Sequence, residues 1–350
     1  MKYDQIIIYY FSGTGNARNA AIWIEKVAKE KDLRTNLTNI DRFKTVDIPE
    51  LSGKTLIGFC APTHGFNMPP IVLKFLFKFP KVKNVDSFIL NTRAGMKLYK
   101  FYLPGLSGVA QLLPALILIL KGFRIVGMQP LDLPSNWLLL HPGLKEKVIY
   151  SIYKRCQGIV NNFAINILDG KRKYKALFSL PVDLALIPVS LGYYFFGRFF
   201  LAKTLVATNA CTNCNICVSK CPVEAIKKVD ERLFWTYKCE SCMRCVNICP
   251  QRAIETAHGF SGLIIVVVYV LLIPFIISIL KYYDILDIEK QSKLFEQVWS
   301  LITTSILILF GFLSYRILHF LMKYKIVNRI ISYSSLSKYK FWRRYKPPEY

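Results

Sequence analysis

The sequence is poor in acidic residues and in histidine. Its 350 residues include 22 Asp and Glu, 47 Lys and Arg and four His, which gives a formal net charge of +25. It contains no Ser-His-Asp arrangement, no catalytic metal triad and no phosphate-transfer motif, so hydrolase and kinase chemistry have no support. The positive charge instead favours contact with anionic lipid head groups, acidic proteins or nucleic acid.

A secretory leader is not expected either. Asp4 precedes an apolar run that ends after Phe11 in a glycine-containing turn, which is too short and too acidic for a signal peptide. We therefore expect a reducing compartment, where the ten cysteines remain thiols or bind metal. Two of them, Cys60 and Cys156, stand apart from the rest and are expected to be buried as small apolar residues.

The other eight cysteines lie in two runs that organise the chain. Each run reads C-x-x-C-x-x-C-x-x-x-C-P, and each cysteine of the first run recurs 28 residues later. Structural zinc is one competing interpretation, but zinc needs four ligands rather than eight. A disulfide scaffold is another, but it suits small secreted domains. The spacing favours two cubane clusters, because three thiolates on one tight loop can bind three iron corners of a cube.

The fourth ligand of each cluster is expected to come from the other run, as it does in two-cluster ferredoxins. One [4Fe–4S] cluster is therefore assigned to Cys211, Cys214, Cys217 and Cys249. The second is assigned to Cys239, Cys242, Cys245 and Cys221. Pro222 and Pro250 follow the two crossing cysteines and are expected to turn the chain away.

The N-terminal segment predicts a strand at 5–11, because a continuous apolar run is typical of a strand buried on both faces. The turn Ser12–Asn16 follows, and a helix is expected to begin there. Such a turn directs backbone N–H groups and hydroxyls to one point and favours phosphate binding. It is not G-x-G-x-x-G, because Arg18 stands at the third glycine position, and no G-K-[ST] follows. Dinucleotide and nucleoside-triphosphate sites are therefore disfavoured.

Strands and helices are predicted to alternate beyond this turn. Strands are expected at 54–60, 87–91 and 123–128, helices at 70–79 and 107–121, and loops at 61–69, 92–95 and 133–137. This alternation predicts an α/β domain with a doubly wound parallel sheet, whose ligand lies beyond the carboxyl ends of the strands.

Over residues 3–255 the chain resembles bacterial flavodoxin–ferredoxin fusion proteins. Phe11-Ser-Gly-Thr-Gly-Asn16 and the loops at 62–67 and 91–95 look like the three FMN loops of flavodoxins, and Pro134-Ser-Asn-Trp137 is similar to a motif that often follows the fifth strand. The resemblance implies that Ser12, Thr14, Asn16 and Ala17 hold the FMN phosphate. It implies further FMN contacts from Gly13, Gly15, Pro62, Thr63, His64, Gly65, Phe66, Asn67, Asn91, Thr92, Arg93, Ala94 and Gly95.

The third of these loops departs from the flavodoxin pattern, because it has no aromatic residue to stack on a flavin. The second loop offers His64 and Phe66, and Trp137 could compensate. We hypothesise that Arg93 lies near the pyrimidine end of the flavin ring, where it would stabilise the reduced form and raise its potential. The alternative is that Arg93 is a solvated loop cation.

Residues 171–205 contain an apolar stretch long enough to reach across a membrane, but it includes Pro181, Asp183, Pro188 and Arg198. A single crossing here would put the flavin and the clusters on opposite sides of the bilayer. We therefore expect an amphipathic, interfacial linker helix, with the basic run 171–175 on the lipid head groups. A helix packed between two domains is the alternative.

Two later segments, 262–281 and 298–320, are apolar and long enough to span a bilayer. The connecting loop 281–297 carries four acidic residues against three lysines, whereas the tail 323–350 is basic. The positive-inside rule then places both termini and the redox domains on the cytoplasmic side of the cytoplasmic membrane. His258 and His319 lie near the ends of these spans and could bind haem or line a quinone site, but interface histidines are expected more often.

The predicted fold class has three parts. They are a flavodoxin-like α/β domain at 1–170 with its linker, an α+β two-cluster ferredoxin domain at 206–257, and a two-helix transmembrane hairpin with a basic tail. The leading hypothesis is a membrane-anchored electron-transfer protein that links FMN to two [4Fe–4S] clusters, with an unknown redox protein or quinone as partner. A membrane-surface reductase acting on quinone or a small molecule, and a redox sensor, are the alternatives. No nucleic acid is expected, because anionic lipid explains charge beside membrane segments.

Overall fold

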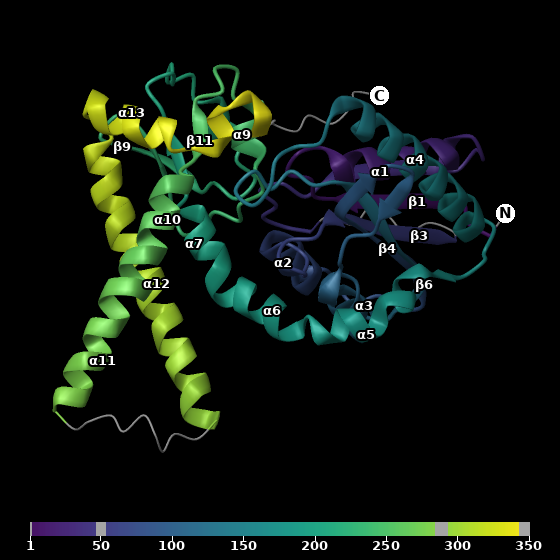
Figure 1. The fold of residues 1–350 in the computed structure, drawn as a ribbon. Coiled ribbons are helices and arrows are strands. Elements are labelled where there is room, and N and C mark those ends of the chain that lie inside the picture. Colours follow the sequence, from purple (N-terminus) through teal and green to yellow (C-terminus); the bar gives the residue numbers. More distant parts are fainter. Residues whose placement is uncertain (1, 47–53, 284–292, 343–350) are drawn as a thin grey trace.

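The computed structural model describes residues 2–46, 54–283 and 293–342. Residues 284–292 of the predicted connecting loop, and Arg343, Arg344 and Lys346 of the predicted basic tail, lie outside these ranges. Figure 1 shows an α/β domain, a ferredoxin-type domain beside it and a helical hairpin that projects from the latter.

The N-terminal domain is built on a sheet with the strand order β2-β1-β3-β4-β6-β7. The strands are β1 (Gln5–Tyr10), β2 (Arg34–Asn39), β3 (Thr55–Pro62), β4 (Val85–Leu98), β6 (Phe123–Pro134) and β7 (Lys173–Tyr174), and β5 (Phe101–Leu103) pairs with the end of β4. The central strands are parallel and follow the flavodoxin-like order, which places the ligand at the switch point between β1 and β3. The predicted doubly wound sheet is confirmed.

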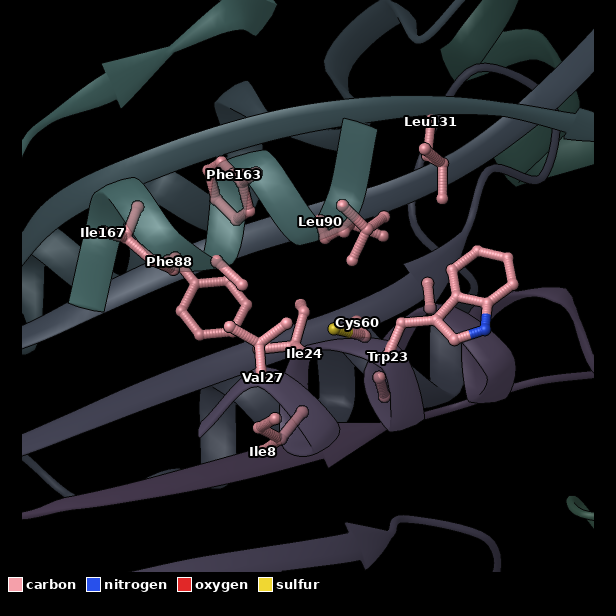
Figure 2. Packing of buried hydrophobic residues seen from close by; sticks show 14 of the residues in the cluster. Ile8, Trp23, Ile24, Val27, Cys60, Phe88, Leu90, Leu131, Phe163 and Ile167 are labelled. Carbon is pink, nitrogen blue, oxygen red and sulfur yellow. The ribbon is translucent and has the colours of Figure 1, made fainter. Parts of the chain in front are cut away.

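Helices cover both faces of this sheet. On one face lie α1 (Asn16–Lys29) and α4 (Glu146–Leu168), and on the other lie α2 (Pro70–Lys78), η1 (Gly108–Ala110) and α3 (Leu112–Leu120). Figure 2 shows the first of the two cores, in which Phe163 of α4 packs on Phe88 of β4 with ring centroids 5.8 Å apart, and Trp23 and Val27 of α1 belong to the same cluster. Cys60 and Cys156 belong to this core and are buried, as predicted.

The third predicted flavin loop is not a loop, which corrects the prediction from sequence. Residues 92–95 continue strand β4, and their backbone pairs with β6 from Thr92↔Leu131 to Gly95↔Pro134. The strand extends because β6 also continues past its predicted end at 128. An ion pair between Arg93 and Asp132, 2.7 Å long, ties the two extensions together.

The ferredoxin-type domain repeats its structure as it repeats its sequence. β8 (Leu205–Ala207) pairs with β11 (Ile254–Thr256), and β9 (Ile226–Val229) pairs with β10 (Arg232–Trp235). The short helices α8 (Ile216–Ser219) and α9 (Arg244–Ile248) each follow a residue in the left-handed conformation, Asn215 or Met243. Each helix carries the third cysteine of its run, so the repeated motif builds two equivalent half-sites.

The linker between the two domains is helical but bent. It comprises η2 (Lys175–Ser179), α5 (Leu180–Ala185), α6 (Ile187–Gly192), η3 (Tyr193–Gly197) and α7 (Arg198–Ala202), which form two segments at 75° to each other. Pro181 and Pro188 lie in the first turns of α5 and α6, where proline is tolerated but a preceding helix does not continue straight. Residues 175–202 are therefore helical, but they form two segments rather than one continuous linker helix.

Two helices that are long and apolar enough to cross a membrane form the hairpin, His258–Tyr282 and Phe295–Leu321. The first comprises α10 (His258–Val266), η4 (Val267–Leu272) and α11 (Ile273–Tyr282), and the second lies within α12 (Lys293–Leu321). The π-helical turn η4 comes just before Pro274, whose missing N–H removes one helical hydrogen bond. The chain then returns along the ferredoxin-type domain through α13 (Lys325–Tyr333), η6 (Leu336–Lys338) and η7 (Lys340–Trp342) (Figure 1).

Candidate flavin and iron–sulfur sites

A cavity of about 360 Å³ opens where β1, β3, β4 and β6 end. Cofactor pockets commonly have this size and this place in a doubly wound sheet. Most of the residues predicted to contact FMN line it: Ser12, Gly13, Thr14, Asn16, Ala17, Pro62, Thr63, His64, Gly65, Phe66, Thr92, Arg93 and Ala94. Gly15, Asn67, Asn91 and Gly95 are not among the lining residues.

Two of these four residues support the loops from behind. Gly15 has a φ of 105°, a left-handed conformation that favours glycine, and its N–H donates to Ser12 Oγ at 3.0 Å. Asn91 is fully buried and donates its amide to Thr63 Oγ1 at 2.7 Å. They therefore shape the cavity without facing it.

The first loop uses its polar side chains for internal contacts. Asn16 Nδ2 donates to the carbonyl of Pro134 at 2.8 Å, and Asn16 Oδ1 accepts from the Tyr153 hydroxyl at 2.6 Å. Thr14 Oγ1 accepts from Asn136. The first turn of α1 carries no acidic residue, so its backbone N–H groups and the helix dipole favour an anion at this end of the cavity.

Aromatic groups also line the cavity. His64 and Trp137 both line it, with ring centroids 6.4 Å apart, and Tyr193 of the linker packs against Trp137 at 5.5 Å. Trp137 therefore supplies an aromatic side chain to the cavity, whereas the third predicted loop supplies none. No sequence pattern indicated the lining residues Gly105, Leu106, Leu140 and His141, and Cys242 was predicted only as a cluster ligand.

Arg93 lines the cavity but is not a solvated cation. Its side chain is 11% exposed and pairs with Asp132, which is 16% exposed. Asp132 Oδ1 also accepts the backbone N–H of Gly105 at 2.8 Å. The carboxylate therefore offsets much of the positive charge that the cavity would otherwise receive from Arg93.

Two buried ionisable side chains lie where the two domains meet, His64 in the cavity lining and Glu240 in the ferredoxin-type domain. Burial lowers the pKa of His64 to about 4, although a hydrogen bond to the Glu240 backbone acts in the opposite direction. The imidazole is therefore neutral at pH 7. Burial raises the pKa of Glu240 to about 7. His64 Nδ1 and Glu240 Oε2 have no hydrogen-bond partner within the part of the chain that the structure describes.

The eight cluster cysteines fall into two groups in space. Cys211, Cys214, Cys217 and Cys249 line one small cavity, and we call them the distal set. In the other group, Cys239, Cys242 and Cys245 each lie close enough to Cys221 for their charges to interact, and we call these four the proximal set. Cys221 of the first run lies with three cysteines of the second run, and Cys249 of the second run lies with three cysteines of the first. The crossed assignment requires this arrangement.

Both groups suit a cubane cluster. Backbone N–H groups point at the ligand sulfurs, from Ala225 to Cys221 at 3.2 Å, from Ser241 to Cys239 at 3.4 Å and from Ala253 to Cys249 at 3.3 Å. Hydrogen bonds of this kind stabilise cluster thiolates. Among residues 2–46, 54–283 and 293–342, no three candidate ligands converge closely enough for a single metal ion. A cubane instead takes its thiolates at four separate iron corners.

The proximal set touches the flavodoxin-like domain directly. Cys242 lines the large cavity, and a Cβ added to Gly13 would lie 2.2 Å from the Cys242 carbonyl oxygen. Arg244 donates to the carbonyl of Ser12 at 2.7 Å and forms an ion pair with Asp41. Arg42 donates to the carbonyl of Cys221 at 2.8 Å. The first flavin loop and the proximal set are therefore held against each other from both domains.

The two sets differ in exposure to solvent. Cys221, Cys239 and Cys245 are buried, whereas Cys214 of the distal set is exposed and Cys211 and Cys249 are partly exposed. The distal set is thus the one that a protein in solution could approach.

The two histidines near the hairpin contact backbone groups. His258 Nδ1 accepts the N–H of Leu336 at 3.0 Å, so its Nε2 carries the proton and donates to the carbonyls of Leu138 and Leu139, both at 3.1 Å. Trp342 Nε1 also donates to Leu138, at 2.6 Å. His319 lies 3.1 Å from the carbonyl of Val229. His258 therefore joins the start of the hairpin to the loop that carries Trp137.

Comparison with known proteins identifies one part of the chain. Residues 210–254 match the family of 4Fe-4S dicluster domains. No match was found among curated proteins. Similar solved structures include a flavodoxin from Streptococcus pneumonia TIGR4, at 12% identity and a TM-score of 0.32, over 46% of this chain and 97% of that one. The flavodoxin of Megasphaera elsdenii shares 15% identity at a TM-score of 0.31, over 46% and 98%.

A flavone reductase is similar at 13% identity and a TM-score of 0.34, over 49% of this chain and 67% of that one. These scores are too low to support an argument, so the assignment of the N-terminal fold rests on its strand order. The chain thus joins a flavodoxin-like domain to a 4Fe-4S dicluster domain, which supports a redox role.

Proposed function

We propose that this chain is a membrane-anchored electron-transfer protein in which an FMN site and two [4Fe–4S] clusters form one series of redox centres. The observation that carries the proposal is the position of Cys242, which belongs to the proximal set and also lines the cavity at the ends of β1, β3, β4 and β6. Bound FMN would supply exchange between two-electron and one-electron chemistry, and the clusters would relay single electrons.

Each part of the chain has a role in this proposal. The loop at 12–17 and the N-terminus of α1 hold the phosphate, while His64, Trp137 and the Arg93–Asp132 pair border the ring. Arg244 and Arg42 keep the first loop against the proximal set. The distal set presents its exposed Cys214 to a partner in solution.

The membrane part of the proposal rests on the hairpin and on the distribution of charge. Two apolar helices could cross the bilayer, and the basic residues of the tail favour the cytoplasmic side for both hairpin ends.

Protease added to sealed, right-side-out membrane vesicles should therefore spare the redox domains. Protease added to inverted vesicles should remove them, and the opposite pattern would reverse the proposed orientation.

The proposal is tested on the full chain, purified anaerobically in detergent. We expect about eight irons, an equal amount of acid-labile sulfide and one released FMN per chain. Cys60→Ala, which changes a core cysteine outside both sets, is the control and should keep all of the iron and flavin. Eight irons without flavin would reject the flavin part, and fewer than eight irons in the parent chain would reject the two-cluster part.

A further inference from the structure

One side of the flavodoxin-like domain exposes large apolar side chains. They come from α2, α3 and the linker, and we call them the apolar face: Phe77, Leu116, Ile119, Leu120, Phe178 and Phe195. Leu120 is 72% exposed and Phe178 is 82% exposed. Figure 1 shows α6 beneath α2 and α5 beneath α3, along the margin of the domain that faces the same way as the projecting hairpin. Large apolar side chains exposed together on neighbouring helices indicate a binding surface for protein or membrane.

The segments that build the apolar face are almost free of negative charge. Residues 69–83, 108–122 and 171–202 contain ten Lys and Arg and a single carboxylate, Asp183. Asp183 is 3% exposed and accepts hydrogen bonds from the Gly108 N–H at 2.8 Å and the Ser179 hydroxyl at 2.7 Å. The face therefore presents apolar side chains and cations together, which is the composition of a surface that binds anionic lipid.

The linker leads from this face to the hairpin. Its 75° bend lies between Ala185 and Ile187, so α5 follows the flavodoxin-like domain and the segment of α6, η3 and α7 leads from there towards α12. At that junction a Cβ added to Gly311 of α12 would lie 3.4 Å from the Phe200 ring of α7, so the two helices are in van der Waals contact. The lipid that surrounds the upper part of α12 would thus also lie beside the linker.

We propose that the apolar face rests on the anionic bilayer into which the hairpin inserts, so that the flavodoxin-like domain is docked on the membrane at a second place. This inference rests on the proposed membrane anchoring and adds a surface and a ligand class to it. The docked linker reaches the flavin site, because a Cβ added to Gly65 would lie 2.0 Å from the Tyr193 ring of η3. Lipid contact would therefore hold the second flavin loop as well as the domain.

Photocrosslinking in lipid tests the docking. The full chain is reconstituted in nanodiscs that contain phosphatidylglycerol, with p-benzoylphenylalanine in place of Leu120 or Phe178, and lipid adducts are counted by mass spectrometry. The same amino acid in place of Leu309, 62% exposed on α12, reports insertion of the hairpin. In place of Tyr150, 60% exposed on α4 at the other face of the sheet, it reports background. Iron and flavin contents confirm that each variant is folded.

We expect adduct yields at 120 and 178 to approach the yield at 309 and to exceed the yield at 150 several-fold. Adducts at 309 alone would overturn the docking and leave the anchoring intact, and adducts to protein at 120 and 178 would assign the face to a partner or a second copy. No adduct at 309 would reject the anchoring itself. Replacing phosphatidylglycerol by phosphatidylcholine should lower the yield at 120 and 178 but not at 309, and an unchanged yield would remove the electrostatic part of the proposal.

Discussion

Arg244 and Gly13 set the approach of the first flavin loop to the proximal set. The Arg244 guanidinium, 15% exposed, spans the domain boundary to Asp41 and to the carbonyl of Ser12. Gly13 supplies the other half of the contact, because the Cys242 carbonyl occupies the space of its missing side chain. These contacts join residues about two hundred positions apart, so no local pattern in the sequence could have indicated them.

Gly13→Ala should separate the two domains. Its methyl group would lie 2.2 Å from the Cys242 carbonyl oxygen, and overpacking of this kind costs about 1–3 kcal/mol. We expect lower FMN affinity and slower flavin–cluster electron exchange, measured by fluorescence titration and stopped-flow absorbance, with the iron content unchanged. The matched control is Gly158→Ala on α4, where no atom lies within 4 Å of the added Cβ. Equal behaviour of the two variants would show that the contact is unimportant.

Arg93 and Asp132 should shift the flavin potential in opposite directions. The two side chains form a largely buried ion pair at the cavity, so removing one leaves the charge of the other uncompensated. Arg93→Ala leaves a carboxylate and should lower the midpoint potential of bound flavin, because reduction adds negative charge to the site. Asp132→Asn leaves the guanidinium and should raise it. Shifts of the same sign in spectroelectrochemical titrations would contradict this electrostatic role.

Among the elements, the buried central strands and their helices were predictable, because continuous apolar runs between turn residues occur in few other contexts. β2 (Arg34–Asn39) was not identified, since it lies at the sheet edge and its sequence RTNLTN is mostly polar. α4 was also missed, although its buried residues recur at helical spacing, among them Ile149, Ile152, Tyr153 and Cys156. The extension of β4 through 92–95 depends on pairing with β6 and has no local signal.

The C-terminal turns should control the order of the loop that carries Trp137. His258 and Trp342 both donate to Leu138, and the N–H of Gly143 donates to the carbonyl of Trp342 at 2.9 Å. We expect His258→Ala to raise amide hydrogen exchange at 138–143 by about tenfold. His258 makes two part-buried hydrogen bonds to this loop, a typical hydrogen bond contributes about 0.5–1.5 kcal/mol, and tenfold corresponds to about 1.4 kcal/mol. The measurement is exchange followed by mass spectrometry on the full chain in detergent.

His319→Ala is the matched control for this prediction. His319 also lies at a helix end and contacts one backbone carbonyl, that of Val229, but it does not touch the loop. Exchange at 138–143 should therefore be unchanged in this variant. A similar increase in both variants would indicate a general loosening of the hairpin rather than a specific contact.

Across the whole molecule, the redox sites follow one another from the cavity to the surface. The proximal set borders the cavity, and the distal set lies beyond it with Cys214 exposed. The cysteine spacing predicts eight ligands and a crossed pairing from cluster chemistry, and the structure brings the eight cysteines together in two groups of that composition. The spacing was not sufficient to order the clusters, because the two runs are equivalent in sequence and are distinguished by contacts with the flavodoxin-like domain, those of Gly13, Arg42 and Arg244.

The crossing cysteines test both the pairing and the order. Cys221 lies with the second run and Cys249 with the first, so Cys221→Ser should remove the proximal cluster and Cys249→Ser the distal one. Each variant should lose about four of about eight irons. The two variants should differ in electron exchange with the flavin. Cys249→Ser keeps the proximal cluster and therefore rapid exchange. Cys221→Ser keeps only the distal cluster, which should exchange electrons with the flavin slowly, because the cysteines beside the cavity no longer hold iron. Freeze-quench electron paramagnetic resonance after flavin reduction distinguishes the two. Rapid exchange in Cys221→Ser together with slow exchange in Cys249→Ser would reverse the assigned order and place the first run beside the flavin.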